Sequence, residues 1–248
     1  MDKKIPIIVL KAGKEKQPKN HHPWVFSGAI AYPKKQDINK SGHVVKVVDS
    51  NNEFIAYGWC DINSHIMVRL LSWSQDEFID DQWVMRKIKE SVERRKDLIE
   101  LNRNRTTAFR LIHGEADFLP GIAVDLYGTS IVILLSARVA LTWEHLLVET
   151  LQTLLNPKKI FVHIDSAFVH LEHLENSVKQ YIDGEVVEIT ESKDKIITCM
   201  ENDLYYIVSL DGQKSGFYCD QRENRAIVAP YAKGKEVLDL FSYTGGFT

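Results

Sequence analysis

Short runs of strand-forming residues fill the first 75 positions and restrict what this chain can fold into. The runs are rich in Val, Ile, Tyr and Trp, and turn-forming residues gather between them, as in "DSNNE". Residues 4–75 therefore predict an all-β unit, and the spacing of the runs favours a small barrel or closed sheet. The runs are "IPIIVL", "HVVKVVD", "FIAYGWC" and "IMVRLLS".

A long amphipathic helix is predicted directly after this unit, over "DDQWVMRKIKESVERRKDLIEL". Asp80 or Asp81 can cap its start, because an Asp side chain accepts hydrogen bonds from the free backbone N–H groups there. We expect this helix to separate the all-β unit from the next domain. Apolar residues recur at helical spacing between charged ones, at Val84, Ile88, Val92 and Ile99.

Residues 107–200 alternate strand-like and helical runs, which predicts an α+β domain. "TWEHLLVETLQTLL" reads as a helix with Thr142 as its cap, and Asn156-Pro157 ends it. Strands are predicted for "AFRLIHGE", "GIAVDLYG", "SIVILLS", "KIFVHID" and "EVVEIT".

The last segments predict the opening of a further domain. "DLYYIVSLDG" is strand-like, and "QKSGFYCDQRENRAIVAPYA" becomes helical in its second half, where Pro230 limits or kinks the end. The chain then closes on "EVLDLFSYTGGFT", which we interpret as a buried strand of parallel type running into a glycine turn. Without neighbouring strands, the apolar side chains of residues 236–241 would be left exposed.

The closing turn has the features of a ligand site. Gly245 and Gly246 let the backbone approach a ligand closely, and Asp239 suits a ligand with an ammonium group, such as an amino acid. The G-x-G-x-x-G pattern of dinucleotide-binding folds is absent, which counts against an oxidoreductase that uses a nucleotide cofactor. Two glycines alone are also compatible with a purely structural turn.

The segment before this strand concentrates polar residues around an aromatic pair. In "DGQKSGFYCDQRENR", charged side chains flank Phe217 and Tyr218 at the expected start of a helix. Helix capping and surface charge can explain them. Because the segment lies just before the glycine strand, the two could also form opposite walls of one pocket.

The combination of "GQKSGFYCDQRENR" with "VLDLFSYTGGFT" resembles class I S-adenosylmethionine-dependent rRNA methyltransferases that carry an N-terminal PUA domain. That group includes the large-subunit rRNA 5-methylcytosine methyltransferases. "LKAGKEKQPKNHHPWVFSGAI" is similar to the PUA opening, and "GEADFLPGIAVDLYG" to the signature of the central domain. The resemblance extends over the whole chain. It implies a PUA-like unit at 1–75, a central domain with its leading helix at 76–190, and the start of a Rossmann-like α/β domain at 191–248.

The resemblance implies roles for two groups of residues. The loop that holds the methionine part of S-adenosylmethionine matches Asp239, Phe241, Ser242, Tyr243, Thr244, Gly245 and Gly246. The segment that closes over the cofactor matches Lys214, Gly216, Phe217, Asp220 and Arg222.

The PUA-like part implies contact with RNA. Lysines suit phosphate contacts and exposed aromatics suit base stacking, although Trp24 and Phe26 could equally belong to the barrel core. The candidates are Lys11, Lys14, His22, Trp24 and Phe26.

Charge and cysteine content agree with these implications. Residues 1–75 hold 11 Lys and Arg against 6 Asp and Glu, whereas the other residues hold 20 against 28. A basic unit on an acidic body favours a polyanionic partner, although a solvated lysine-rich face gives the same count. Three widely spaced cysteines fit neither a disulfide framework nor a zinc site, and they favour a cytoplasmic protein.

The sequence departs from the family's pattern at four positions. His21-His22 and Asp203 stand where glycine is usual, and the turn at Asp203 is expected to be strained. Ser215 stands for the usual Thr and keeps the hydroxyl. Pro230 interrupts a helix that relatives continue.

Three other groups of residues have plain structural explanations. Cys219 lies near Lys214 and Arg222 in sequence, which could lower the pKa of its thiol, but a buried small residue is our expectation for all three cysteines. Glu115 and Asp117 could act as an acid–base pair or belong to an acidic turn. We expect no metal site, although His170 and His173, with His163 nearby, could share a helix face.

The expected function is transfer of a methyl group from S-adenosylmethionine to a base of ribosomal RNA, cytosine C5 of 23S rRNA in particular. The resemblance places the catalytic residues beyond Thr248, so we expect a C-terminally truncated enzyme that is inactive alone. The alternative is a non-catalytic RNA-binding module. The family also implies a homodimer, and no apolar run is long enough to span a membrane.

Overall fold

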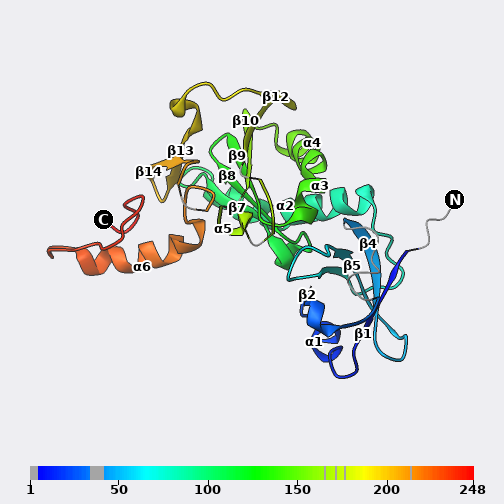
Figure 1. Ribbon diagram of the computed structural model, residues 1–248. Coiled ribbons are helices and arrows are strands. Elements are labelled where there is room, and N and C mark those ends of the chain that lie inside the picture. The colour runs from blue at the N-terminus through cyan, green and yellow to red at the C-terminus, as the bar shows by residue number, and fades with distance from the viewer. Residues whose placement is uncertain (1–4, 34–41, 165, 171, 176, 213) are drawn as a thin grey trace.

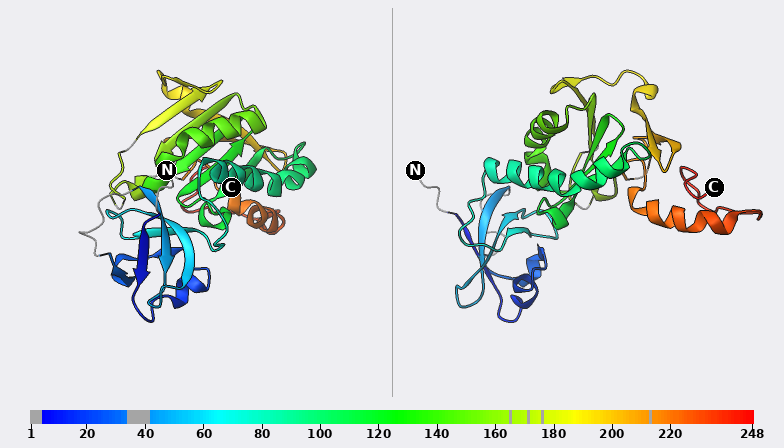
Figure 2. Two further views of the ribbon diagram at one scale, coloured as in Figure 1. Left: turned by 90° about the vertical axis from the view of Figure 1, so that its right-hand side faces the viewer. Right: turned by 180° about the vertical axis from the view of Figure 1, so that it is seen from behind.

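The computed structural model describes residues 5–33, 42–164, 166–170, 172–175, 177–212 and 214–248. The N-terminal sheet and the C-terminal helix lie on opposite sides of a central α+β body (Figures 1 and 2). No helix in the described part of the chain is both long and apolar enough to cross a membrane.

The N-terminal unit is one curled sheet of six strands, which confirms the prediction of a β unit. In the described residues its outer strands do not pair with each other, so the predicted closure into a barrel is not seen. The strand order β2-β6-β5-β4-β1-β3 makes β2 and β3 the outer strands, and only β1 and β4 run parallel. A short helix, α1 (Lys16–Lys19), and a 3₁₀ turn (Ser27–Ala29) interrupt it. The strands are β1 (Ile7–Leu10), β2 (Trp24–Val25), β3 (Ile30–Tyr32), β4 (His43–Val48), β5 (Phe54–Cys60) and β6 (Val68–Ser72).

Helix α2 (Asp81–Asn102) forms as the sequence predicts. The Asp80 carboxylate caps it by accepting a hydrogen bond from the backbone N–H of Trp83 at 2.8 Å. Val84, Ile88 and Val92 are buried on the face that packs against the central sheet. The helical period of the apolar residues therefore identified the packed face correctly.

The central domain is built on a second six-stranded sheet, in the order β12-β11-β10-β9-β8-β7. Only β9 and β10 run parallel, and helices α3 (Arg138–Thr142) and α4 (Glu144–Leu155) form the crossover between them. Helix α5 (Ser166–Val169) is a single turn. The strands are β7 (Ala108–His113), β8 (Ile122–Tyr127), β9 (Ser130–Leu135), β10 (Lys159–Ile164), β11 (Val178–Ile182) and β12 (Glu185–Val187).

The predicted cap of helix α4 is wrong, although its predicted end is right. Thr142 is the last residue of α3, and its hydroxyl donates to the Val139 carbonyl at 2.7 Å instead of capping α4. Trp143 occupies the cap position without a side-chain hydrogen bond. Asn156 ends the helix in the left-handed conformation that Asn tolerates well.

Both faces of the central sheet are covered. Helices α2 and α4 pack on one face around Val124, Ile133 and Val162. A hairpin of β13 (Ile196–Glu201) and β14 (Leu204–Ser209), preceded by a 3₁₀ turn (Ser192–Lys195), packs on the other. The tip of this hairpin confirms the expected strained turn, because Asp203 has a φ of 69°.

Polar and aromatic contacts join the N-terminal sheet to the central domain. The buried guanidinium of Arg69 lies 2.7 Å from the Glu172 carboxylate and 3.4 Å from that of Glu115. The Trp59 and Trp143 rings meet with centroids 5.5 Å apart. Because Arg69 and Glu172 are both buried, separating the two units would expose two opposite charges of one pair.

The closing segment differs from its prediction. A 3₁₀ turn (Cys219–Gln221) leads into helix α6 (Arg222–Ala232), which ends shortly after Pro230. Residues 236–241 form no strand, so the predicted buried strand is wrong for this chain. Val237, Leu238 and Leu240 are 56%, 81% and 69% exposed, as expected for a strand sequence without neighbours to pair with.

Candidate functional site

The segment 214–218 is held between the central sheet and the β13–β14 hairpin. Gly216 has a φ of 99°, and a Cβ atom placed on it would lie 2.4 Å from the Val208 side chain and 2.8 Å from the Ser209 carbonyl oxygen. Only glycine fits there, for both steric and conformational reasons. The glycine predicted from the motif is therefore a point of close backbone approach.

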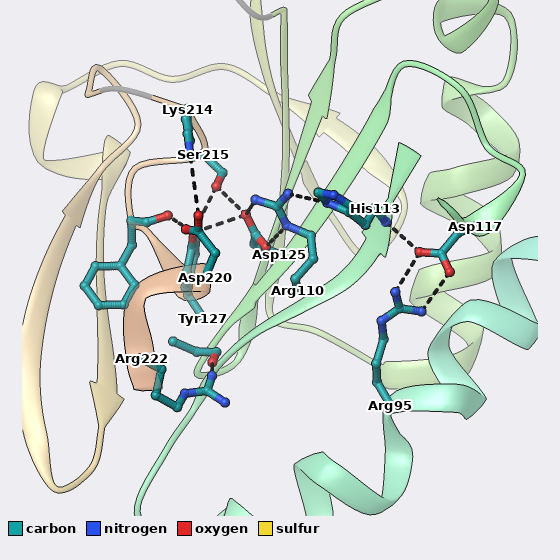
Figure 3. A network of polar contacts seen from close by, with 12 residues as sticks. Arg95, Arg110, His113, Asp117, Asp125, Tyr127, Lys214, Ser215, Asp220 and Arg222 are labelled. Atoms are coloured by element: carbon teal, nitrogen blue, oxygen red, sulfur yellow. Dashed lines mark hydrogen bonds and ion pairs between the residues drawn. The ribbon is translucent and has the colours of Figure 1, made fainter. Parts of the chain in front are cut away.

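A buried polar network fixes Ser215, the residue next to it. Ser215 donates to the Asp125 carboxylate and lies 3.0 Å from the Tyr127 hydroxyl. Arg110 makes two hydrogen bonds to Asp125, at 2.6 and 3.0 Å (Figure 3). Burial lowers the pKa of Arg110 and the nearby carboxylate raises it, with a net increase, so the guanidinium stays charged.

Phe217 belongs to the core. Its ring is fully buried, with the Tyr206 ring centroid at 4.9 Å and the Tyr127 ring edge-on at 6.5 Å. The Tyr127 hydroxyl also donates to the Phe217 carbonyl at 3.4 Å. Phe217 therefore anchors the segment through packing, together with the buried Ser215 and Gly216, whereas Lys214 is exposed.

Lys214 and Asp220 remain available to a ligand. The side chains are 48% and 63% exposed, and the Lys214 ammonium lies 3.9 Å from the Asp220 carboxylate. The same ammonium lies 4.3 Å from the centroid of the Tyr218 ring, which favours a cation over its face. The opposite charges next to a fixed backbone suit a zwitterionic ligand.

Arg222 is engaged with the protein. Its guanidinium donates to the Ala108 carbonyl (Figure 3). It also stacks over the Phe109 ring at 4.8 Å and lies 3.6 Å from the Glu201 carboxylate. Arg222 therefore ties the start of α6 to the central sheet. A role in cofactor binding would be additional to this structural one.

The two predicted walls lie against each other. The Tyr243 hydroxyl donates to the Gly216 carbonyl at 3.1 Å, and the Tyr218 and Tyr243 rings meet edge-on at 5.6 Å. Gly246 lies so close to Arg225 that an added Cβ would be 3.0 Å from its side chain. The glycine turn is therefore folded back onto the segment that the sequence placed opposite it.

The other residues of the closing loop are more open. Asp239 is half-buried and accepts a hydrogen bond from the Thr248 hydroxyl at 3.1 Å. Phe241 is fully exposed and Ser242 is exposed, while Thr244 is half-buried. The Gly245 N–H closes a turn by donating to the Ser242 carbonyl at 2.9 Å.

The sequence did not predict that Asp125 and Tyr127 contact the candidate site, or that Arg225 pairs with a buried carboxylate. The first two contact Ser215 from almost 90 positions away, and Arg225 forms a buried pair with Glu201. One signal was available, because a charged residue inside the apolar strand "GIAVDLY" requires a buried partner.

The three cysteines are not reactive thiolates. Burial raises the pKa of the Cys60 and Cys199 thiols to about 12. Burial and the Asp125 carboxylate raise the pKa of Cys219 despite the nearby Arg110 and Arg222. Cys60 and Cys199 are buried as expected, whereas Cys219 is half-buried, so that expectation is wrong for Cys219. The lowered pKa considered for Cys219 is also wrong, because its pKa is raised.

The aromatic residues of the candidate RNA surface are exposed. Trp24 and Phe26 keep 36% and 46% of their surface accessible, so assigning them to the core is wrong. Their rings meet edge-on at 6.5 Å, and the Trp24 indole N–H donates to Glu115 at 2.8 Å. His22 packs against Trp24 at 5.9 Å, which extends the surface.

The two candidate lysines are both exposed. Lys11 donates to the Gly28 carbonyl at 2.8 Å, and Lys14 lies in the adjoining turn. His21 adopts a φ of 65°, and its ring stacks on Trp73 at 4.8 Å. Stacking stabilises a conformation that a histidine otherwise disfavours.

The acidic pair near residue 115 is structural. The buried Asp117 carboxylate accepts hydrogen bonds from Arg95 and the His113 backbone (Figure 3) and from Arg94. Its pKa is lowered because these donors outweigh burial. Glu115 accepts from Trp24 and Arg69. Among the described residues, no cluster of three or more His, Cys, Asp or Glu side chains could hold a metal ion.

Sequence comparisons give two kinds of relative. Residues 8–73 match the family model of a PUA-like domain. The ribosomal RNA large subunit methyltransferase I of Tolumonas auensis is 35% identical over 241 residues, covering 97% of this chain and 58% of that protein. Its counterpart in Pseudoalteromonas atlantica is 34% identical with the same coverage. The chain thus spans about 58% of the length of these curated relatives.

Two solved structures share the fold. "A putative sam-dependent methyltransferase from Streptococcus mutans" superposes with a TM-score of 0.74 at 20% identity, covering 98% of this chain and 59% of that one. A second chain, described as a putative methyltransferase complexed with SAH, gives a TM-score of 0.75 at 20% identity, with 98% and 58% covered. At this identity the superposition establishes a common fold.

Proposed function

We propose that this chain carries the RNA-binding unit and part of the cofactor site of a class I S-adenosylmethionine-dependent rRNA methyltransferase. The contact between the Tyr243 hydroxyl and the Gly216 carbonyl carries the proposal, because it joins the two segments that match the family's cofactor site. The likeness to large-subunit rRNA methyltransferases supports the same reading.

The side chains present fit the methionine part of the cofactor. Asp239 offers a half-buried carboxylate to an ammonium group, and Lys214 offers an exposed ammonium to a carboxylate. When bound, S-adenosylmethionine supplies an electrophilic methyl group. The residues of this chain would orient the amino acid end of the cofactor, and the Gly245 turn would let the backbone approach it.

RNA binding is proposed for the surface around Trp24. Exposed rings at Trp24 and Phe26 suit stacking on unpaired bases, and Lys11 and Lys14 suit phosphates. The expected substrate is 23S rRNA with cytosine C5 as the methylated atom. We also propose a cytoplasmic location and a homodimer, both on the family resemblance.

We further propose that residues 1–248 alone bind the cofactor weakly and transfer no methyl group. Phe241 is fully exposed and Asp239 is open on one side, so the described walls enclose little of a ligand. The proposed units are the PUA-like unit at 1–75, the central domain at 76–190 and the methyltransferase portion at 191–248.

An alternative is a non-catalytic RNA-binding module, which the exposed aromatic surface favours equally. Amide chemical shifts distinguish the two, because they detect weak binding. S-adenosylmethionine at millimolar concentration should shift the amides of Gly216, Gly245 and Gly246, and less so in the Asp239→Asn variant. Binding of an rRNA fragment without any such shift would favour the module.

Methyl transfer tests the remaining part of the proposal. Purified residues 1–248 with tritiated cofactor and 23S rRNA should incorporate no label above that of a heat-treated sample. Clear incorporation would contradict the inactivity of this chain while supporting the reaction. Failure to bind both RNA and cofactor would overturn the proposed function as a whole.

A further inference from the structure

The Asp125 carboxylate is fully buried, yet it lies in the middle of an apolar strand. A buried charge is unfavourable unless it is paired and its remaining hydrogen-bonding positions are filled. Arg110 neutralises it from the neighbouring strand β7, with hydrogen bonds of 2.6 and 3.0 Å. The Tyr127 hydroxyl, at 3.3 Å, and the Ser215 hydroxyl fill the other positions.

The network around the Arg110–Asp125 pair continues into the candidate site. Ser215 is fully buried and is the only member of the network from the segment 214–218 that bonds the carboxylate among the described residues (Figure 3). The next residue, Gly216, accepts the hydrogen bond from Tyr243. A short path of bonds therefore runs from Asp125 through Ser215 and Gly216 to the closing loop.

We propose that Asp125 is a positioning residue for the candidate cofactor site. By holding Ser215 it fixes the Gly216 carbonyl, and this carbonyl in turn holds Tyr243 and the glycine turn behind it. The central domain thereby sets the spacing between the two walls. The inference rests on the proposed function for what the walls bind, while the coupling between them can be measured without any ligand.

The primary variant is Ser215→Ala, which removes one hydroxyl and leaves the Arg110–Asp125 pair intact. Amide hydrogen exchange at Gln221 and Gly245 reports on the two walls, because both amides donate hydrogen bonds in turns there. We expect both to exchange about tenfold faster, the effect of losing a hydrogen bond to a charged group. The amides of β8 and β9 should keep their protection.

Ser215→Thr is the matched control, since it restores a hydroxyl at the same position. It should return both amides to their original exchange rates, which loss of packing would not explain. Tyr243→Phe should accelerate exchange at Gly245 alone. Asp125→Asn should reproduce Ser215→Ala if it folds, and Ser215→Ala decides the matter if it does not.

Two outcomes would overturn the proposal. Faster exchange at Gln221 with no change at Gly245 would mean that the closing loop does not depend on Asp125. Failure of Ser215→Thr to restore protection would assign the effect to side-chain volume. If instead the coupling holds but the cofactor shifts no amide in the unmodified chain, the positioning role stands and the cofactor assignment falls.

Discussion

Arg225 and Glu201 form a two-bonded ion pair that fastens helix α6 to the hairpin. Arg225 Nε lies 2.7 Å from Glu201 Oε1, and Nη2 lies 2.9 Å from Oε2. Both side chains are buried, and the same Nη2 also donates to the Tyr218 carbonyl at 2.8 Å. The pair therefore holds the candidate cofactor segment as well as the helix.

Arg225→Ala should lower the free energy of unfolding by about 3 kcal/mol or more, because Glu201 is left buried with only Arg222 at 3.6 Å to compensate it. The Arg105–Asp203 pair is exposed and provides the control, since Arg105→Ala should change stability by about 1 kcal/mol at most. Urea denaturation followed by circular dichroism measures both. Equal effects of the two variants would contradict a special role for Arg225.

Trp24→Ala and Phe26→Ala should weaken binding to single-stranded rRNA while the fold stays intact. Stacking of a base on an aromatic ring contributes about 1–3 kcal/mol, so each variant should lose roughly fivefold to a hundredfold in affinity. Fluorescence anisotropy with a labelled RNA measures this. Tyr231→Ala serves as control, because Tyr231 is equally aromatic and 79% exposed but lies on α6. An equal loss in that variant would place the RNA surface elsewhere.

Lys11→Ala and Lys14→Ala should each weaken RNA binding at low salt and reduce its dependence on salt. A neutralised phosphate contributes about 0.7–0.9 to the slope of log K against log salt concentration, so the double variant should flatten the slope by roughly 1.5. Lys193→Ala, in the turn before β13, is the matched charge control. A slope that stays unchanged in the double variant would remove both lysines from the RNA surface.

The Lys19–Asp49 contact predicts a loss of stability in acid. The hydrogen bond from Lys19, at 2.6 Å, and two backbone N–H donors lower the pKa of Asp49 from 3.8 to about 2, against the opposing effect of burial. Since the folded state holds the proton less tightly, this stabilisation is complete above pH 3.8 and is lost as the pH falls towards 2.

Asp49→Asn should therefore be less stable than the unmodified chain at pH 5, and the difference should shrink at pH 2. Urea denaturation at the two pH values measures it, and Asp97→Asn on the exposed side of α2 is the control. A difference that is the same at both pH values would show that the charge of Asp49 contributes nothing.

Local sequence patterns predicted the helices and strands whose formation depends on their own residues and on burial of one face. Helix α2 was found because its apolar residues repeat at the helical period and Asp80 caps it. The cap of α4 was misplaced because Thr142 satisfies its hydroxyl within α3. Residues 236–241 were misread because a parallel strand depends on neighbours, which apolar residues alone do not guarantee.

The residues of the candidate site that stand in contiguous motifs could be predicted from the sequence. Gly216 was named through the family resemblance, and the structure gives the physical reason for the glycine, a φ of 99° and close contact with Val208. Asp125 and Tyr127 could not be connected to Ser215, because the bonds join residues far apart in the chain. The partners of a buried charge can be identified only from the folded structure, in which the sheet and the hairpin pack together.

The buried ion pair between Arg69 and Glu172 holds the N-terminal sheet and the central domain at a fixed distance from each other. Because both charges are buried, the N-terminal sheet and the central domain cannot separate or rotate freely about that point. An RNA bound at Trp24 would then reach the candidate cofactor site around Gly216 only at a fixed distance along its backbone. Under the proposed function, the methylated nucleotide would be selected by its distance along the RNA from the base held at Trp24, as well as by base identity.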